Sequence, residues 1–99
     1  MEKTILVGLV NRNQDHKKCQ EYLDELEFLS FTAGGTVAQR FTQRIENPNP
    51  ATLIGKGKMD EISTFVKAMD IQTIIFDDEL SPAQEKNISK ILKIKVLDR

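Results

Sequence analysis

The sequence predicts an α/β domain built on a four-stranded parallel sheet. Apolar runs at 5–10 and 73–76 have the composition of strands that are buried on both faces. Amphipathic segments with helical spacing separate the expected strands, and this alternation favours parallel pairing with right-handed crossovers. The chain has 99 residues, the usual size of one domain. We therefore expect residues 1–99 to form a single α/β domain with helices on both faces of the sheet.

The first strand is expected at 4–10, where TILVGLV is continuously apolar around Gly8. From about Asp15 the period changes to that of an amphipathic helix, with charged residues opposite an apolar stripe. The stripe consists of Cys19, Tyr22, Leu23, Leu26 and Leu29. Gly34 and Gly35 then provide left-handed backbone positions that end a helix.

The second strand is expected at 36–45, with Val37, Phe41 and Ile45 on one face. Its other face carries Arg40 and Arg44. Two arginines on one face disfavour a central position in a parallel sheet, so this strand is placed at an edge. Together with the central character of the runs at 5–10 and 73–76, this predicts the strand order 2-1-3-4.

The later elements follow the same alternation. In chain order we expect a loop at 47–50, a helix after Gly57, a strand at 73–77, a helix from Ser81 and a short strand at 95–97. Ser81 and Gln84 have the spacing of a capping box, and Pro82 suits the first position of a helix.

Composition excludes several classes of protein. The longest apolar stretch has six residues, whereas a membrane helix needs about 20. No secretory signal pattern is present, and the lone Cys19 fits a reducing cytosol, so we expect a cytoplasmic protein without a membrane span. One His and one Cys exclude the usual zinc ligand sets, and His16 is expected to be an exposed residue at a helix start. The net charge of −1 predicts no general attraction to nucleic acid.

One segment nevertheless has the composition of an anion site. Gly55, Lys56, Gly57 and Lys58 open a helix, and free amides at a helix N-terminus attract phosphate. The segment is neither a Walker A loop, because Met59 follows Lys58, nor a dinucleotide-binding fingerprint.

Arg40 and Arg44 extend this basic stretch, about 13 Å apart on one strand face at ~3.3 Å per residue. Phosphate contacts from such residues position a protein on RNA. Ordinary solvated surface charge is the alternative interpretation of the same residues.

A second polar cluster, Asp77, Asp78 and Glu79, follows an expected strand, where open α/β sheets bind ligands. A magnesium site or phospho-accepting Asp would need further carboxylates after the first strand, but Asn11 and Arg12 stand there. We therefore favour acids that complement the dipole of the next helix. No catalytic set and no metal site is recognisable.

Three segments resemble the N-terminal domain of HflX-type GTPases: PNPATLIGKGK at 48–58, FDDELSPAQ at 76–84 and VLDR at 96–99. ELEFLSFTAGGTVAQRFTQR at 25–44 fits as well, so the likeness covers nearly the whole chain. Leu53 stands where many relatives carry an aromatic residue. The resemblance implies a Rossmann-like N-terminal domain, with a helical linker and a G domain following in the longer protein.

The resemblance also implies a function. Family members bind the large ribosomal subunit and act in ribosome splitting and rescue, with this region reaching towards the peptidyl transferase centre. The implied rRNA-facing residues are Arg40, Arg44, Gly55, Lys56, Gly57 and Lys58. The chain itself is expected to be no enzyme and to hold no cofactor, since GTP and Mg²⁺ belong to the G domain. Its expected partners are large-subunit rRNA and its own linker and G domain. Two alternatives remain: an ATP-binding module at Gly55–Lys58, and an intramolecular regulator of the G domain.

We predict that the 99-residue chain neither hydrolyses GTP nor binds it at micromolar concentrations. A GTP phosphate cradle needs a Gly-rich loop, a Lys followed by Ser or Thr, and an Asp that holds magnesium. Lys58 followed by Met59 lacks the magnesium-binding hydroxyl. Titration with a fluorescent GTP analogue tests this, and saturable micromolar binding would contradict it.

Overall fold

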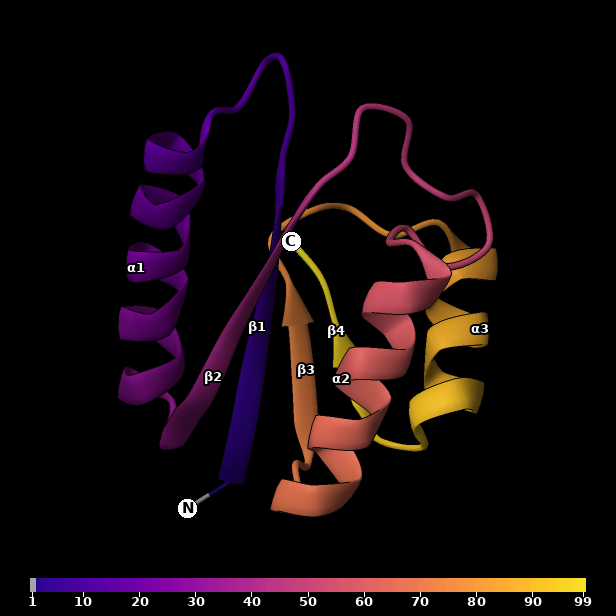
Figure 1. Ribbon diagram of the computed structural model, residues 1–99. Coiled ribbons are helices and arrows are strands. Elements are labelled where there is room, and N and C mark those ends of the chain that lie inside the picture. Colours follow the sequence, from indigo (N-terminus) through magenta and orange to yellow (C-terminus); the bar gives the residue numbers. More distant parts are fainter. Residues whose placement is uncertain (1) are drawn as a thin grey trace.

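The computed structural model describes residues 2–99, which form a parallel four-stranded sheet flanked by three helices (Figure 1). The spatial order of the strands is β2-β1-β3-β4, and each neighbouring pair is parallel. This confirms the predicted order and the edge position of the second strand. The elements are β1 (Glu2–Val10), α1 (His16–Thr32), β2 (Gly35–Arg44), α2 (Lys56–Met69), β3 (Thr73–Phe76), α3 (Pro82–Leu92) and β4 (Lys95–Leu97).

All seven expected elements are present, with bounds shifted by one or two residues. β1 begins at Glu2 because backbone pairing with β2 starts there, ahead of the apolar run. Gly34 takes the left-handed conformation expected after α1, with φ of 92°, whereas Gly35 is already the first residue of β2. The capping box at the start of α3 is confirmed, with Ser81 and Gln84 each bonding the other's backbone amide.

One expectation about β2 is wrong. The register with β1 shifts between Thr4 and Ile5, whose partners are Val37 and Gln39, so Ala38 is the extra residue of a bulge. A one-residue shift moves side chains to the opposite face. Val37 therefore packs beside α1, while Phe41 and Ile45 pack on the other side of the sheet.

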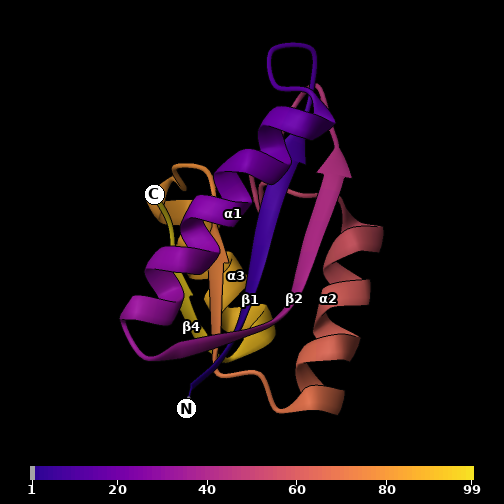
Figure 2. The same cartoon turned by 90° about the vertical axis from the view of Figure 1, so that its left-hand side faces the viewer.

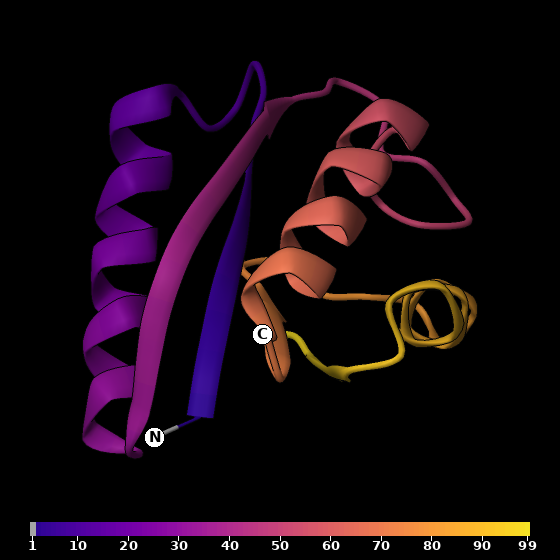
Figure 3. The same ribbon diagram turned by 60° about the horizontal axis from the view of Figure 1, so that its bottom comes forward.

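The helices are divided unequally between the two faces of the sheet. α1 alone covers one face, where it lies against β1 and β2, and α2 and α3 cover the other (Figures 1 and 3). The larger core lies between the sheet and the α2–α3 layer. Its fully buried members are Ile5, Val7, Ile54, Ile62, Ile74, Phe76 and Ile88.

α1 approaches β1 closely at Gly8. A Cβ atom at this position would lie 2.7 Å from Cys19 Sγ and 3.2 Å from a methyl carbon of Leu23. Both of these α1 residues are fully buried, so the helix has little room to retreat. The glycine thus sets the distance between α1 and the sheet.

We predict that Gly8→Ala destabilises the domain by about 1–3 kcal/mol, the usual effect of overpacking a filled core. Gly57→Ala is the matched control. It lies in the first turn of α2 with no atom within 4 Å of a new Cβ, and should stabilise the domain by up to about 1 kcal/mol. Urea unfolding of both variants measures the effects, and equal midpoints would contradict the close approach.

Candidate anion-binding surface at the carboxyl edge of the sheet

The start of α2 is joined directly to the end of β2. Gly55 is the N-cap, with extended backbone and no side-chain cap. Its N–H donates to Gln43 Oε1 at 2.9 Å, and a Cβ on Gly55 would lie 3.2 Å from Gln43 Nε2. The glycine therefore permits a close contact that brings the α2 amides to the carboxyl edge of the sheet.

The two lysines of this helix start differ in exposure. The Lys56 side chain is 91% exposed, and its Nζ lies 3.5 Å from Asp60 Oδ2. The Lys58 side chain is only 22% exposed, and its Nζ lies 3.2 Å from Glu61 Oε1. Pairs of this kind on a helix surface contribute at most about 0.5 kcal/mol, so an incoming phosphate can replace them.

Arg44 ends β2 next to Gln43, and so borders the same edge as Lys56. Its side chain is exposed and pairs with Glu46 at 3.4 Å. Glu46 also accepts the backbone N–H of Arg12, which links the loops that follow β2 and β1. The structure thus brings Arg44, Gly55 and Lys56 together, but each cation has a carboxylate neighbour.

Arg40 lies elsewhere, contrary to the expectation of a shared basic face. Its Nη2 is 2.7 Å from Asp24 and 2.9 Å from Glu27, and its Nη1 donates to Gln20. Burial lowers the pKa of Arg40, but hydrogen bonds to Asp24 and Glu27 outweigh it and raise the pKa above its ordinary value. These partners are on α1, so the sheet separates Arg40 from α2.

The loop between β2 and α2 is held in one conformation by polar contacts. Asn49 and Leu53 exchange backbone hydrogen bonds at 2.9 and 2.7 Å. Side chains of α3 grip the same loop: Gln84 donates to the carbonyl of Asn49 and Asn87 to that of Ala51. Leu53 has a positive φ of 67° and is buried in the core, so its side chain is not displayed for stacking on a base.

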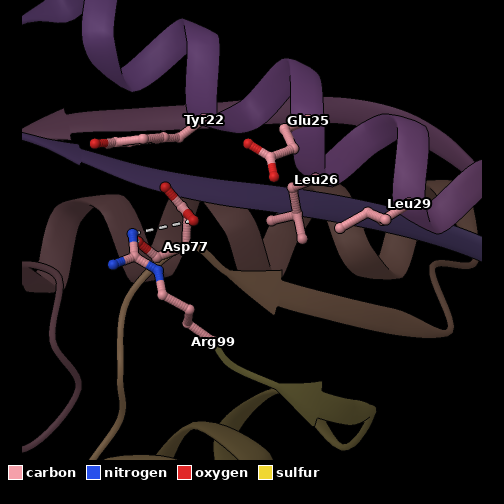
Figure 4. A pocket seen from close by; sticks show the side chains of 6 residues that line it. All are labelled: Tyr22, Glu25, Leu26, Leu29, Asp77 and Arg99. Atoms are coloured by element: carbon pink, nitrogen blue, oxygen red, sulfur yellow. Dashed lines mark hydrogen bonds and ion pairs between the residues drawn. The ribbon is translucent and has the colours of Figure 1, made fainter.

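A second polar cluster at this edge involves the last two residues, which sequence analysis did not single out. Arg99 Nη2 lies 3.1 Å from Asp77 Oδ1 and donates to the Asp77 carbonyl at 2.8 Å (Figure 4). Asp98 Oδ2 accepts the N–H of Leu80 at 2.7 Å. Asp77 is therefore held by Arg99 instead of complementing the α3 dipole. The available indication was that carboxyl ends of parallel strands meet at one edge.

Neither a metal centre nor a membrane-spanning helix is found among residues 2–99. No group of three or more His, Cys, Asp or Glu side chains in this range is arranged to hold an ion. No helix in the same range has both the length and the apolar character needed to cross a bilayer. His16 is exposed at the start of α1, as predicted.

Cys19 is a buried, unreactive thiol. Burial raises its pKa, and the nearby Asp77 and Asp78 raise it further, against smaller opposite effects of Arg40 and Gln14. A thiol that keeps its proton is a poor nucleophile and a poor metal ligand.

Comparisons with known proteins agree with the three motif segments. Residues 20–99 match the family described as GTP-binding GTPase N-terminal. The chain is 60% identical over 98 residues to GTPase HflX of Flavobacterium psychrophilum, covering 99% of this chain and 24% of that protein. It is 39% identical over 82 residues to GTPase HflX of Escherichia coli K12, covering 83% of this chain and 19% of that protein.

A solved structure shows the same fold. A GTP-binding protein from Sulfolobus solfataricus, in complex with GDP, matches with a TM-score of 0.68 at 24% identity. The match covers 99% of this chain and 27% of that one. The chain thus spans about a quarter of the length of its relatives.

The parallel sheet and its three motif-bearing segments define an N-terminal α/β domain of a GTP-binding protein. The chain belongs to the HflX family of GTPases, whose members match it along its whole length.

The electrostatics of this edge predict a pH effect. Burial raises the pKa of the Asp78 carboxyl; Arg99 lowers it and Asp77 raises it, with a net upward shift. The folded protein then holds this proton to higher pH than the unfolded chain. Stability from Asp78 is present below its ordinary pKa of about 3.9 and is lost as pH rises through the folded value.

We therefore expect Asp78→Asn, which cannot ionise, to increase the free energy of unfolding at about pH 7 and to change it little at about pH 3.5. Urea unfolding at both pH values measures this. Glu79→Gln, at the exposed neighbouring residue, is the control. A gain that is no larger at neutral than at acidic pH would show that desolvation of Asp78 is unimportant.

Proposed function

We propose that this domain docks a cytoplasmic GTP-binding protein onto the large ribosomal subunit, near the peptidyl transferase centre, during ribosome splitting and rescue. The contacting surface is the carboxyl-edge strip of Arg44, Gly55, Lys56, Gly57 and Lys58. The observation that carries the proposal is the start of α2, which has no side-chain cap and projects an almost fully exposed Lys56. GTP and Mg²⁺ are assigned to the part of the longer protein that lies outside this chain.

The chemistry of the strip suits rRNA phosphates. Backbone N–H groups at a helix start and adjacent cations bind phosphate oxygens, and such contacts orient a protein without reading base sequence. The strip is held by Gln43 on β2 and, through the preceding loop, by Gln84 and Asn87 on α3. A preorganised surface loses less conformational entropy on binding.

Charge balance requires exchange of partners on binding. The strip carries Arg44, Lys56 and Lys58, each within 3.5 Å of a carboxylate. These exposed pairs are weak, and a polyanion supplies many phosphates with condensed counterions. We therefore expect binding to be driven by counterion release and to weaken steeply with salt.

The test is a triple charge reversal, Arg44→Glu, Lys56→Glu and Lys58→Glu, in the full-length protein. We expect weaker binding to large subunits and a shallower plot of log K against log salt, by up to roughly 0.9 for each phosphate that the variant no longer neutralises. Arg40 is left unchanged, because a carboxylate there would face Asp24 and Glu27 and disturb α1. The measurement is subunit pelleting across a salt titration.

Reversal of Lys67, Lys90 and Lys93 provides the matched control, because these lysines are exposed near the helix ends at the opposite edge of the sheet. Binding and salt slopes that match wild type for both triple variants would refute the docking surface. In that case, calorimetry with ATP decides whether the start of α2 is a nucleotide phosphate site. Saturable ATP binding that the first triple variant lacks would support that alternative.

A further inference from the structure

One half of the α1 face of the sheet is uncovered. A helix with its side chains is ~10 Å across and strands are ~4.8 Å apart, so one helix covers about two strands. On the far face, α2 and α3 together cover the sheet. On the near face, α1 lies over β1 and β2 only, and β3 and β4 have no helix above them within residues 2–99 (Figure 2).

A groove follows this uncovered strip along the side of α1. At its carboxyl end is a cavity of about 350 Å³, lined by Tyr22, Glu25, Leu26, Leu29, Asp77 and Arg99 (Figure 4). A second hollow of about 290 Å³ continues between the end of α1 and β3–β4, where Ser30, Ile75 and Leu97 are among the lining residues. Large apolar side chains border both hollows: Tyr22 is 37% exposed, Leu29 55% and Leu97 41%.

The groove also contains an unsatisfied polar atom. Asp77 is 8% exposed, and its Oδ1 pairs with Arg99. Its Oδ2 is buried and accepts no hydrogen bond from residues 2–99. A buried acceptor without a partner is unfavourable, so the site is incomplete in this chain.

We propose that the groove is the seat of a fourth helix, formed by the polypeptide that directly follows Arg99 in the full-length protein. This helix places an apolar stripe on Leu26, Leu29 and Ile75 and supplies a hydrogen-bond donor near Asp77. It completes the α1 layer as α3 completes the opposite one.

Three observations favour this occupant over a separate partner. The chain leaves the domain at the groove itself, where Arg99 lies beside Asp77 and over the ring of Tyr22 at 5.8 Å. The matched relatives are about four times longer than this chain, and the matched family is described as N-terminal, so they carry chain beyond this region. A covalently attached segment also has a millimolar effective concentration at the groove, which favours it over free competitors.

The test compares Leu29→Arg with Phe28→Arg in the full-length protein, without ribosomes. These neighbours on α1 are 55% and 65% exposed, but only Leu29 lines the groove. Hydrogen exchange followed by mass spectrometry is measured over residues 22–29 and over the residues that follow Arg99. We expect protected amides after Arg99 in wild type and in Phe28→Arg, and exchange faster by roughly tenfold or more in Leu29→Arg.

Two results would overturn the proposal. Identical exchange after Arg99 in both variants shows that no segment packs on the groove. A dimer of the longer protein that Leu29→Arg dissociates, as measured by light scattering, identifies a second copy as the occupant instead. Because no ribosome is present, neither result depends on the docking function proposed above.

Discussion

Hydrogen bonding of β1 on both sides is the constraint on which the rest of the structure depends. β1 pairs with β2 along its whole length and with β3 over its middle, and its residues from Thr4 to Val10 are all buried. A strand buried on both faces needs helices on both sides. Right-handed crossovers then place α1 on one face, because β2 lies to one side of β1, and α2 and α3 on the other.

The same topology explains why distant motifs meet. Parallel strands bring all their carboxyl ends to one edge, so the segments at 48–58, 76–84 and 96–99 become neighbours there. Side chains of one segment then satisfy backbone groups of another: Gln84 bonds the carbonyl of Asn49, and Asp98 accepts the N–H of Leu80. Bonds of this type fix loops that have no secondary structure of their own. The resulting edge is a rigid platform.

Two separate surfaces follow from this architecture. The strip at Arg44 and Lys56 belongs to the β2 side and the start of α2, whereas the groove beside Asp77 belongs to the uncovered half of the α1 face. Gln43 and Gly55 hold the first, and Arg99 lines the second. A domain with this separation can contact an external polyanion and its own downstream chain at once, without competition between the two.

Local patterns in the sequence determined the elements. Continuous apolar runs, helical spacing, and the Ser81–Gln84 capping box depend on residues close in the chain, and two arginines sufficed to place β2 at an edge. The start of α2 as an exposed basic segment was likewise predictable. Only the tertiary structure decided which charges share a surface. The partners of Arg40 lie across the sheet layer on α1, Arg99 meets Asp77 across 22 residues, and a bulge at Ala38 redirects Val37. Such pairings depend on register and layer geometry, which local sequence does not encode.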